Sequence, residues 1–353
     1  MVGLVGKLML LGVDSGLRCV PYLPNVPNLP NLSLIDLQRK LLGDSVRNDA
    51  FAEAMKKVIK KGETIVIDLG SGTGFLSFLA SRLGAKHVTL IESGEICKTS
   101  KALAKRNGIN NCTFLCKHST RVHGLPKADV LLSETLGNYA LEENILESIE
   151  DGKRFLKPNG IVIPAKISQF VCPVVTDRLQ KEIDVWPHVG FDLDFTEARE
   201  IAMNNIYVKT VKKEDLLALP DSIRQWDSID FSRSHQRGAP PRDTNSSMRK
   251  ANVVWTFEKP TTVHGFALWW NAELVKGVEL STSPMKPATH WEQIYLPLLK
   301  SVSVPKGSSI ELRLTSDTRW KTKINLTWTL RLLDEKGKQI SMQELDMRKG
   351  LIG

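Results

Sequence analysis

Two glutamates nine positions apart, Glu134 and Glu143, are the residues of this chain best suited to chemistry on a cation. They flank a Gly-containing segment that follows the apolar run 130–132. A strand followed by such a turn places both carboxylates at the carboxyl edge of a sheet, where open α/β folds bind ligands. Two carboxylates there can hold a planar cation through bidentate hydrogen bonds. The alternative is that one carboxylate caps a helix and the other is a solvated surface charge.

A second candidate site lies upstream, where the apolar strand pattern 65–67 is followed by an acid and a G-x-G-x-G run. Glycines there allow a tight turn and the close approach of a ligand to the backbone. Glu92 ends the next strand, roughly 20 residues on, where an acid can bind ribose hydroxyls. The candidate cofactor contacts are Asp68, Gly70, Ser71, Gly72, Gly74 and Glu92.

The spacing of this run favours S-adenosylmethionine over a dinucleotide. The third glycine, Gly74, comes too early for G-x-G-x-x-G. Asp68, placed before the first glycine, also suits a cationic methionyl group better than a pyrophosphate. The alternative is an incidental Gly-rich β–α turn.

Helices and strands must hold these sites in place. The patterns in the first half of the chain predict a doubly wound parallel sheet. A helical pattern covers 35–61. Strand patterns then alternate with helical ones, the strands lying at 65–67, 87–91, 112–116 and 130–132. The pattern ends near 158–160, where Pro-Asn-Gly precedes a last apolar run and Pro164.

The second half predicts a β-barrel or sandwich, because short alternating runs recur with turns between them. These runs lie at 253–257, 266–270, 310–314 and 326–330. Residues 186–219 carry helical stretches and no clean strand pattern. We therefore expect an N-terminal segment with a Pro/Asn linker over 1–34, a Rossmann-like domain with an N-terminal helix over 35–164, and a β domain over 165–353. A polar, basic loop spans about 232–250 of that β domain.

Composition narrows the class of protein. The 353 residues carry a net charge of +9, spread thinly over the two ends, so it indicates solubility charge, with nucleic-acid binding as the alternative. No apolar run approaches a membrane span. The cysteines lack the second pair that a zinc site needs, so we expect no metal, reduced thiols and a cytoplasmic protein, or a nuclear one in a eukaryote. They are Cys19, Cys97, Cys112, Cys116 and Cys172.

Taken together, these motifs resemble the protein arginine methyltransferase family from about Ile35 to Leu332, with some similarity to its monomethylating branch at 117–120. The run 68–74 resembles the family's cofactor loop, and 133–143 resembles its "double-E" loop. Residues 289–291 resemble its Thr-His-Trp loop, and 43–47 its N-terminal helix. The resemblance implies a Rossmann-like domain, a β-barrel domain and a helical dimerisation arm at about 186–219, hence a homodimer.

The resemblance also implies roles for particular residues. Arg47 would contact the cofactor carboxylate, and Ser119 and Thr120 would join the cofactor contacts. His290 would pair with Asp44 and help to remove a proton, and Trp291 would offer a flat face to the substrate cation. A structural role for His290 and a place in the β core for Trp291 are the alternatives.

The chain departs from the family at three places. The family's tyrosine-rich motif should lie near 28–32, where this chain has no aromatic residue. Arg121 replaces the acid that meets the adenine, and Thr135-Leu136 replaces a common aromatic–Met pair.

The function we expect is methyl transfer from S-adenosylmethionine to a guanidinium nitrogen of an Arg-containing protein or peptide, gripped by Glu134 and Glu143. One alternative is a methyltransferase of the same fold with a different acceptor. The other is a catalytically weak scaffold that binds RNA or a partner through basic residues of the 232–250 loop. Those residues are Arg233, Arg237, Arg242, Arg249 and Lys250.

Overall fold

An all-parallel sheet forms the core of the first half of the chain, as the sequence predicts. The computed structural model describes residues 32–218, 222–232, 247–319 and 324–351. The sheet order is β3 (Cys112–Leu115), β2 (His87–Ile91), β1 (Ile65–Leu69), β4 (Ala128–Ser133), β5 (Leu156–Ile163). The chain moves outward from β1 in both directions, so the order reverses between β1 and β4. Ligands bind at the carboxyl ends of the strands beside such a switch point.

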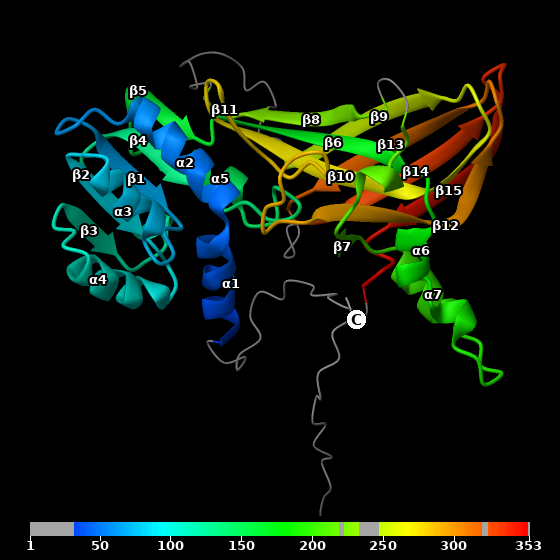
Figure 1. Cartoon of the computed structure of the whole chain (residues 1–353), viewed down its shortest axis with the longest axis horizontal. Helices are drawn as coiled ribbons and strands as arrows, with labels where there is room; N and C mark the ends of the chain where they lie inside the picture. Colours follow the sequence, from blue (N-terminus) through cyan, green and yellow to red (C-terminus); the bar gives the residue numbers. More distant parts are fainter. Residues whose placement is uncertain (1–31, 219–221, 233–246, 320–323, 352–353) are drawn as a thin grey trace, which may run out of the picture.

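Helices connect these strands and cover the sheet (Figure 1). They are α3 (Phe75–Arg82), α4 (Ile96–Arg106) and α5 (Ile145–Lys153), with the 3-10 turn η1 (Ser119–Arg121) before β4. The last strand, β5, runs through the Pro-Asn-Gly segment at which the sequence pattern ends.

The single helical pattern expected over 35–61 is divided into α1 (Leu32–Gly43) and α2 (Ser45–Val58). Asp44 separates them, because its backbone is extended and its carboxylate accepts the Arg47 N–H at 2.9 Å. A side chain that takes a free N–H of the first turn is an N-cap, and it begins a new helix. Figure 1 shows α1 extending away from the parallel sheet.

Two antiparallel sheets form the second half, which confirms the expected β domain. One has the order β7 (Tyr207–Lys209), β12 (Gln293–Val304), β10 (Thr261–Val275), β6 (Lys166–Val174), β8 (Arg224–Asp230), with β11 (Val278–Ser281) beside β10. The other has the order β15 (Gln339–Asp346), β14 (Leu326–Leu333), β13 (Ser309–Asp317), β9 (Met248–Thr256). The Trp328 indole N–H of β14 donates to the Pro297 carbonyl of β12 at 2.8 Å, which joins the two sheets.

The helical segment begins earlier and ends earlier than the sequence predicts. It comprises α6 (Arg178–Ile183), the 3-10 turn η2 (Trp186–His188) and α7 (Thr196–Met203), and it projects from the β domain (Figure 1). The expected absence of a strand from 186–219 is wrong, because β7 pairs with β12. After the turn η3 (Lys213–Asp215), Leu216 forms a backbone bridge with Val174 of β6, and both Leu216 and Leu217 are buried.

Two further expectations are corrected. The thiols are not all reduced, because Cys97 and Cys116 form a disulfide, while Cys112 and Cys172 are free. Arg249 is not available to nucleic acid, because its guanidinium is buried in an ion pair with Asp227 of β8. The basic residues Arg233, Arg237 and Arg242, the residue Cys19 and residues 28–31 of the span 28–32 lie outside the described residues.

Neither a membrane-spanning helix nor a metal cluster is found in the described ranges. No helix there is long and apolar enough to cross a bilayer. Those same ranges contain no group of His, Cys, Asp and Glu that could hold a metal ion.

Asp44 also joins the two halves of the molecule. Its Oδ2 accepts the His290 backbone N–H at 2.8 Å and lies 2.7 Å from His290 Nδ1. Burial opposes ionisation of Asp44, but the hydrogen bonds from His290 and Arg47 hold its pKa below the ordinary value. The expected pairing of Asp44 with His290 is therefore present.

Asp44→Ala should lower the free energy of unfolding by about 2–4 kcal/mol, because it removes a helix cap and leaves buried donors unpaired. Chemical denaturation measures this loss. The matched control is Asp36→Ala, which removes an exposed acid of α1 paired only with Arg39 and Lys40 and should change little. Equal effects of the two substitutions would contradict a structural role for Asp44.

Candidate active site

The loop after β1 is shaped by three glycines that other residues could not replace. Gly70, Gly72 and Gly74 have φ angles of 72°, 54° and 87°, in the left-handed region that favours glycine. A Cβ on Gly70 would lie 2.8 Å from Thr135 Cγ2, and one on Gly74 would lie 2.6 Å from Phe78 Cζ. The loop therefore packs directly against the segment that carries Glu134.

Acidic residues surround this loop. Asp68 is buried at the end of β1 and accepts the Ser77 hydroxyl at 2.6 Å. Burial raises the pKa of Asp68 to about 7, and the charges of Glu92 and Glu134 add to the rise against the Ser77 hydrogen bond. Glu92 lies beside the loop, where its carboxylate accepts the N–H groups of Gly72 at 3.0 Å and Gly94 at 2.6 Å.

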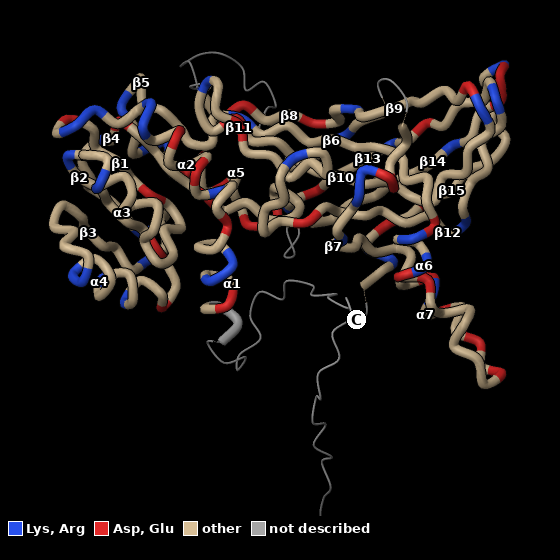
Figure 2. The backbone as a smooth tube through the Cα atoms, in the orientation of Figure 1, with Lys and Arg blue, Asp and Glu red and all other residues tan. Residues whose placement is uncertain are grey.

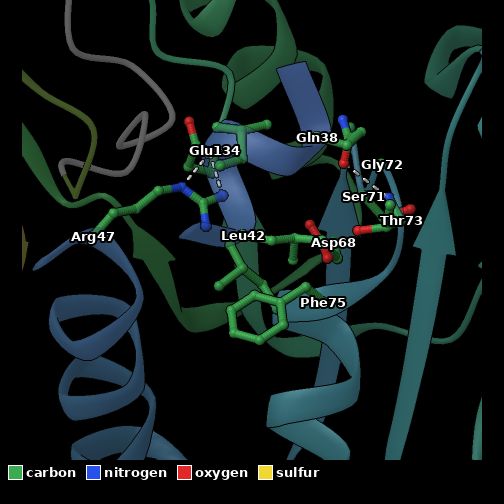
Figure 3. Close-up of a pocket in the computed structure, with 12 residues that line it drawn as sticks. Gln38, Leu42, Arg47, Asp68, Ser71, Gly72, Thr73, Phe75 and Glu134 are labelled. Atoms are coloured by element: carbon green, nitrogen blue, oxygen red, sulfur yellow. Dashed lines mark hydrogen bonds and ion pairs between the residues drawn. The ribbon is translucent and has the colours of Figure 1, made fainter. Parts of the chain in front are cut away.

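A cavity opens over the loop (Figure 3). Its lining includes four of the expected cofactor contacts from the loop, namely Asp68, Gly70, Ser71 and Gly72, and the two ion-paired residues Arg47 and Glu134. Sequence reasoning missed the rest of the lining, which comprises Gln38, Leu41, Leu42, Thr73, Phe75 and Leu76. The spacing of 38, 41 and 42 on one helical face was the available signal.

The lining fits S-adenosylmethionine on observations of this chain alone. The Ser71 hydroxyl is buried and has no hydrogen-bond partner among the described residues, so it is available to a ligand. The positive-φ glycines leave room that a Cβ would fill. Asp68 supplies a carboxylate suited to a cationic group. The Gln38 amide oxygen accepts the Thr73 N–H at 3.4 Å across this space (Figure 3).

The expected contacts of Ser119 and Thr120 are less direct. Both lie in η1 and neither lines the cavity. Arg154 fixes this turn by donating to the carbonyls of Ser119 at 2.6 Å and Val122 at 2.7 Å. Their contact with the cofactor stays a prediction.

Arg47 and Glu134 form a buried ion pair. The Arg47 Nε donates to Glu134 Oε2 at 2.8 Å, and a second guanidinium nitrogen donates to the same oxygen (Figure 3). The two side chains are 7% and 6% exposed. Arg47, which we expect to contact the cofactor carboxylate, is thus bound to Glu134, one of the two acids expected to grip the guanidinium (the clamp). Arg47 also lines the cavity. Its contact with the cofactor stays a prediction.

Glu143 is in the opposite situation. No described residue donates a hydrogen bond to its carboxylate, in contrast to Glu134. Burial raises the pKa of Glu143 to about 8, and the charges of Glu134 and Glu142 add to the rise. Much of Glu143 is therefore protonated at neutral pH in the absence of a cation, and a cation beside it would favour its ionised form.

The β domain holds the segment between these acids, residues 134–143, which we call the double-E loop. The Trp291 indole N–H donates to the Leu136 carbonyl at 2.7 Å, and the Trp270 indole N–H donates to the Gly137 carbonyl at 3.0 Å. The two indoles meet edge to face with centroids 5.0 Å apart. Trp291 is only 5% exposed, so its observed contact is with this loop, and its contact with a substrate cation stays a prediction.

Three acids in this site give the stability of the protein a defined pH dependence. The pKa values of Asp68, Glu142 and Glu143 are about 7, 7 and 8, well above the value of about 4 in an unfolded chain. The folded state keeps protons that the unfolded chain has already released. The stability these protons contribute is full below pH of about 4 and is lost as the pH rises through 7–8.

We expect the Tm of the wild type to fall more steeply between pH 6 and 9 than the Tm of Glu143→Gln, which cannot titrate at this position. Thermal unfolding of both proteins across this range measures the difference, and the titrating groups that do not interact with Glu143 cancel in the comparison. Parallel curves would contradict a protonated Glu143.

Comparisons with known proteins place this site in a family. Residues 59–238 match the methyltransferase domain family, and residues 165–333 match the arginine methyltransferase oligomerization subdomain. Protein arginine N-methyltransferase 6 of Danio rerio is 28% identical over 292 residues, which are 78% of this chain and 80% of that protein. Its probable counterpart in Arabidopsis thaliana is 24% identical over 322 residues, or 78% of this chain and 72% of that protein.

Solved structures share the fold. The Trypanosoma brucei arginine methyltransferase 1 enzyme–prozyme heterotetramer with AdoHcy has a TM-score of 0.76 at 21% identity, covering 90% of this chain and all of that one. Arabidopsis thaliana protein arginine methyltransferase 10 has a TM-score of 0.71 at 18% identity, covering 88% and 97% of the two chains. With the methyltransferase and oligomerization segments both matched, the chain belongs to the protein arginine methyltransferase family.

Proposed function

We propose that this protein transfers a methyl group from S-adenosylmethionine to a guanidinium nitrogen of arginine in protein substrates. The observation that carries the proposal is the pair Glu134 and Glu143. Glu134 lines the cavity over the glycine loop and is fixed by Arg47, whereas no described residue donates a hydrogen bond to the carboxylate of Glu143. The relatives that align with most of the chain are named protein arginine N-methyltransferases, which supports this acceptor.

The chain's residues divide the work. The glycine loop, Asp68 and Ser71 would hold S-adenosylmethionine, which supplies an electrophilic methyl group on a sulfonium. Arg47 binds and orients Glu134, so one face of the arriving guanidinium would meet a fixed carboxylate. Glu143 has no competing donor among the described residues and would take the other face, losing its proton to the approaching positive charge. Fixing the nitrogen beside the methyl donor supplies much of the rate.

The product guanidinium must lose one proton, and two groups are placed to accept it. Glu143 is the better matched of the two, because its pKa of about 8 lies close to neutral pH. His290 is 11% exposed and is fixed by Asp44 through Nδ1, so it holds one orientation. Asp44 thereby positions His290 whether or not the imidazole takes the proton.

The decisive experiment supplies isotopically labelled S-adenosylmethionine and an Arg/Gly-rich peptide, with mass spectrometry of the product. Glu134→Gln and Glu143→Gln should each lower kcat/KM for the peptide by roughly 10²-fold or more, because each removes a charge that grips the guanidinium. Cofactor affinity, measured by calorimetry, should change little in either variant. Any change should be larger in Glu134→Gln, because its partner Arg47 lines the cavity.

The matched control is Glu63→Gln, at an exposed acid in the turn before β1 that should leave the rate unchanged. Near-normal activity of either clamp variant would rule out the clamp. Methyl transfer to small molecules but never to peptides would replace arginine with another acceptor.

The protein carries the family's oligomerization subdomain, and we further propose that it forms a homodimer through the arm 184–195. The arm tip exposes apolar side chains, with Phe191 90% and Leu193 61% exposed, next to Asp192 and Asp194. A groove on the outer surface of α4 offers the complement, apolar at Leu103 and flanked by basic residues. Figure 2 shows acidic residues at the arm tip and basic residues along α4.

Phe191→Glu and Leu103→Asp should each convert the dimer to a monomer, because each places a charge in an apolar contact. Light scattering at micromolar protein measures the mass. Ile340→Glu, on the exposed strand β15, is the control and should leave the mass unchanged. A monomeric wild type, or a dimer in both arm and groove variants, would contradict this interface.

A further inference from the structure

A third acid, Glu142, lies inside the double-E loop and folds back across it. Its Oε1 accepts the Asn138 backbone N–H at 2.8 Å, and its own N–H donates to the Tyr139 carbonyl at 2.9 Å. The side chain crosses Gly137 so closely that a Cβ there would lie 1.9 Å from Glu142 Cγ and 2.0 Å from Oε1. The acid at 142 and the glycine at 137 are therefore matched to each other.

The bond made by Glu142 completes a turn that the β domain holds from the other side. The Asn138 side-chain oxygen accepts the Glu292 N–H at 2.9 Å, and the Gly137 carbonyl accepts the Trp270 indole at 3.0 Å. The Tyr139 hydroxyl donates to Ser316 of β13 at 2.7 Å. Glu142 supplies the hydrogen bond to the Asn138 backbone N–H from within the loop itself.

This turn separates the two acids of the clamp. Glu134 lies three residues before Gly137, and Glu143 directly follows Glu142. We propose that Glu142 is a positioning residue for the guanidinium clamp, which closes the turn from Asn138 to Glu142 and so sets the spacing between Glu134 and Glu143. The proposal rests on the proposed arginine methylation where it is tested by methylation rates. It rests on the structure alone where it is tested by hydrogen exchange of the loop backbone.

The bond does not require a charge at position 142. Burial raises the pKa of Glu142 to about 7, against the hydrogen bonds from Asn138 and Tyr139. The neutral acid and a glutamine amide both present an oxygen to the Asn138 N–H. Alanine cannot, and it leaves that partly buried donor without this partner. Glutamine should therefore rescue what alanine loses.

The first test compares Glu142→Ala and Glu142→Gln with the wild type. Glu142→Ala should lower kcat/KM for an Arg/Gly-rich peptide by about 10–100-fold, as expected when reacting groups lose their alignment. The Kd for S-adenosylmethionine should stay unchanged, because Glu142 does not line the cofactor cavity. Glu142→Gln should stay close to the wild-type rate. Full activity of the alanine variant, or equal loss in both variants, would overturn the proposal.

Hydrogen exchange of the segment 134–143 gives a readout that does not depend on methylation. Exchange should accelerate in Glu142→Ala and remain slow in Glu142→Gln. Unchanged exchange in the alanine variant would overturn the proposal. If the wild type methylates no arginine, the proposed function fails on that result, and the exchange rates still decide whether Glu142 holds the turn.

A double-mutant cycle tests the match between the two positions. Gly137 does not have a positive φ, and the three atoms nearest to a Cβ built there all belong to the Glu142 side chain. Gly137→Ala should impair the wild type as strongly as Glu142→Ala does, yet add little in the Glu142→Ala background. Equal impairment by Gly137→Ala in both backgrounds would show that the two positions are independent and would overturn the proposal.

Discussion

The hold of the β domain on the double-E loop is the constraint on which the site depends. The chain leaves the parallel sheet at Ser133, so the carbonyls of Leu136 and Gly137 have no strand partner. Buried carbonyls need donors, and two tryptophan indoles from the other domain supply them. The clamp therefore exists only when the two domains are packed together. The same hydrogen bonds therefore hold the two domains together and hold the double-E loop in place.

The start of α2 connects the same parts from the other side. Asp44 caps the helix and binds His290, which fixes the first turn of α2 against the β domain. Arg47 lies three residues further along that turn, so the cap also determines where its guanidinium reaches Glu134. A displacement of Asp44 would thus move Arg47, and with it the lining of the cofactor cavity and the position of Glu134, although Asp44 does not line the cavity.

Local patterns predicted the strands of the parallel sheet, four strands of the β domain (β9, β10, β13 and β14), the glycine loop and the two acids, because each depends on spacing within one short segment. They did not predict β6, β7, β8, β11, β12 and β15. The break of the helical pattern at Asp44 did not follow, since its partner His290 is far away in the sequence. The Cys97–Cys116 disulfide was missed for a similar reason. It forms because α4 packs beside β3, which spacing alone does not show. Nothing in the local pattern distinguished Glu142, and only its close approach to Gly137 reveals its role.

The clamp is asymmetric for an electrostatic reason. Burial and the neighbouring charge of Glu134 raise the pKa of Glu143, so its carboxyl favours the protonated form until a cation arrives. Here Arg47 neutralises Glu134, and Glu143 retains its proton. In the proposed mechanism, an arriving guanidinium would meet the carboxylate fixed by Arg47 and would create the second charge by displacing the proton of Glu143. A neutral acceptor could not do so, because it would leave Glu143 protonated. The asymmetry therefore favours a cationic acceptor before any contact specific to arginine is made.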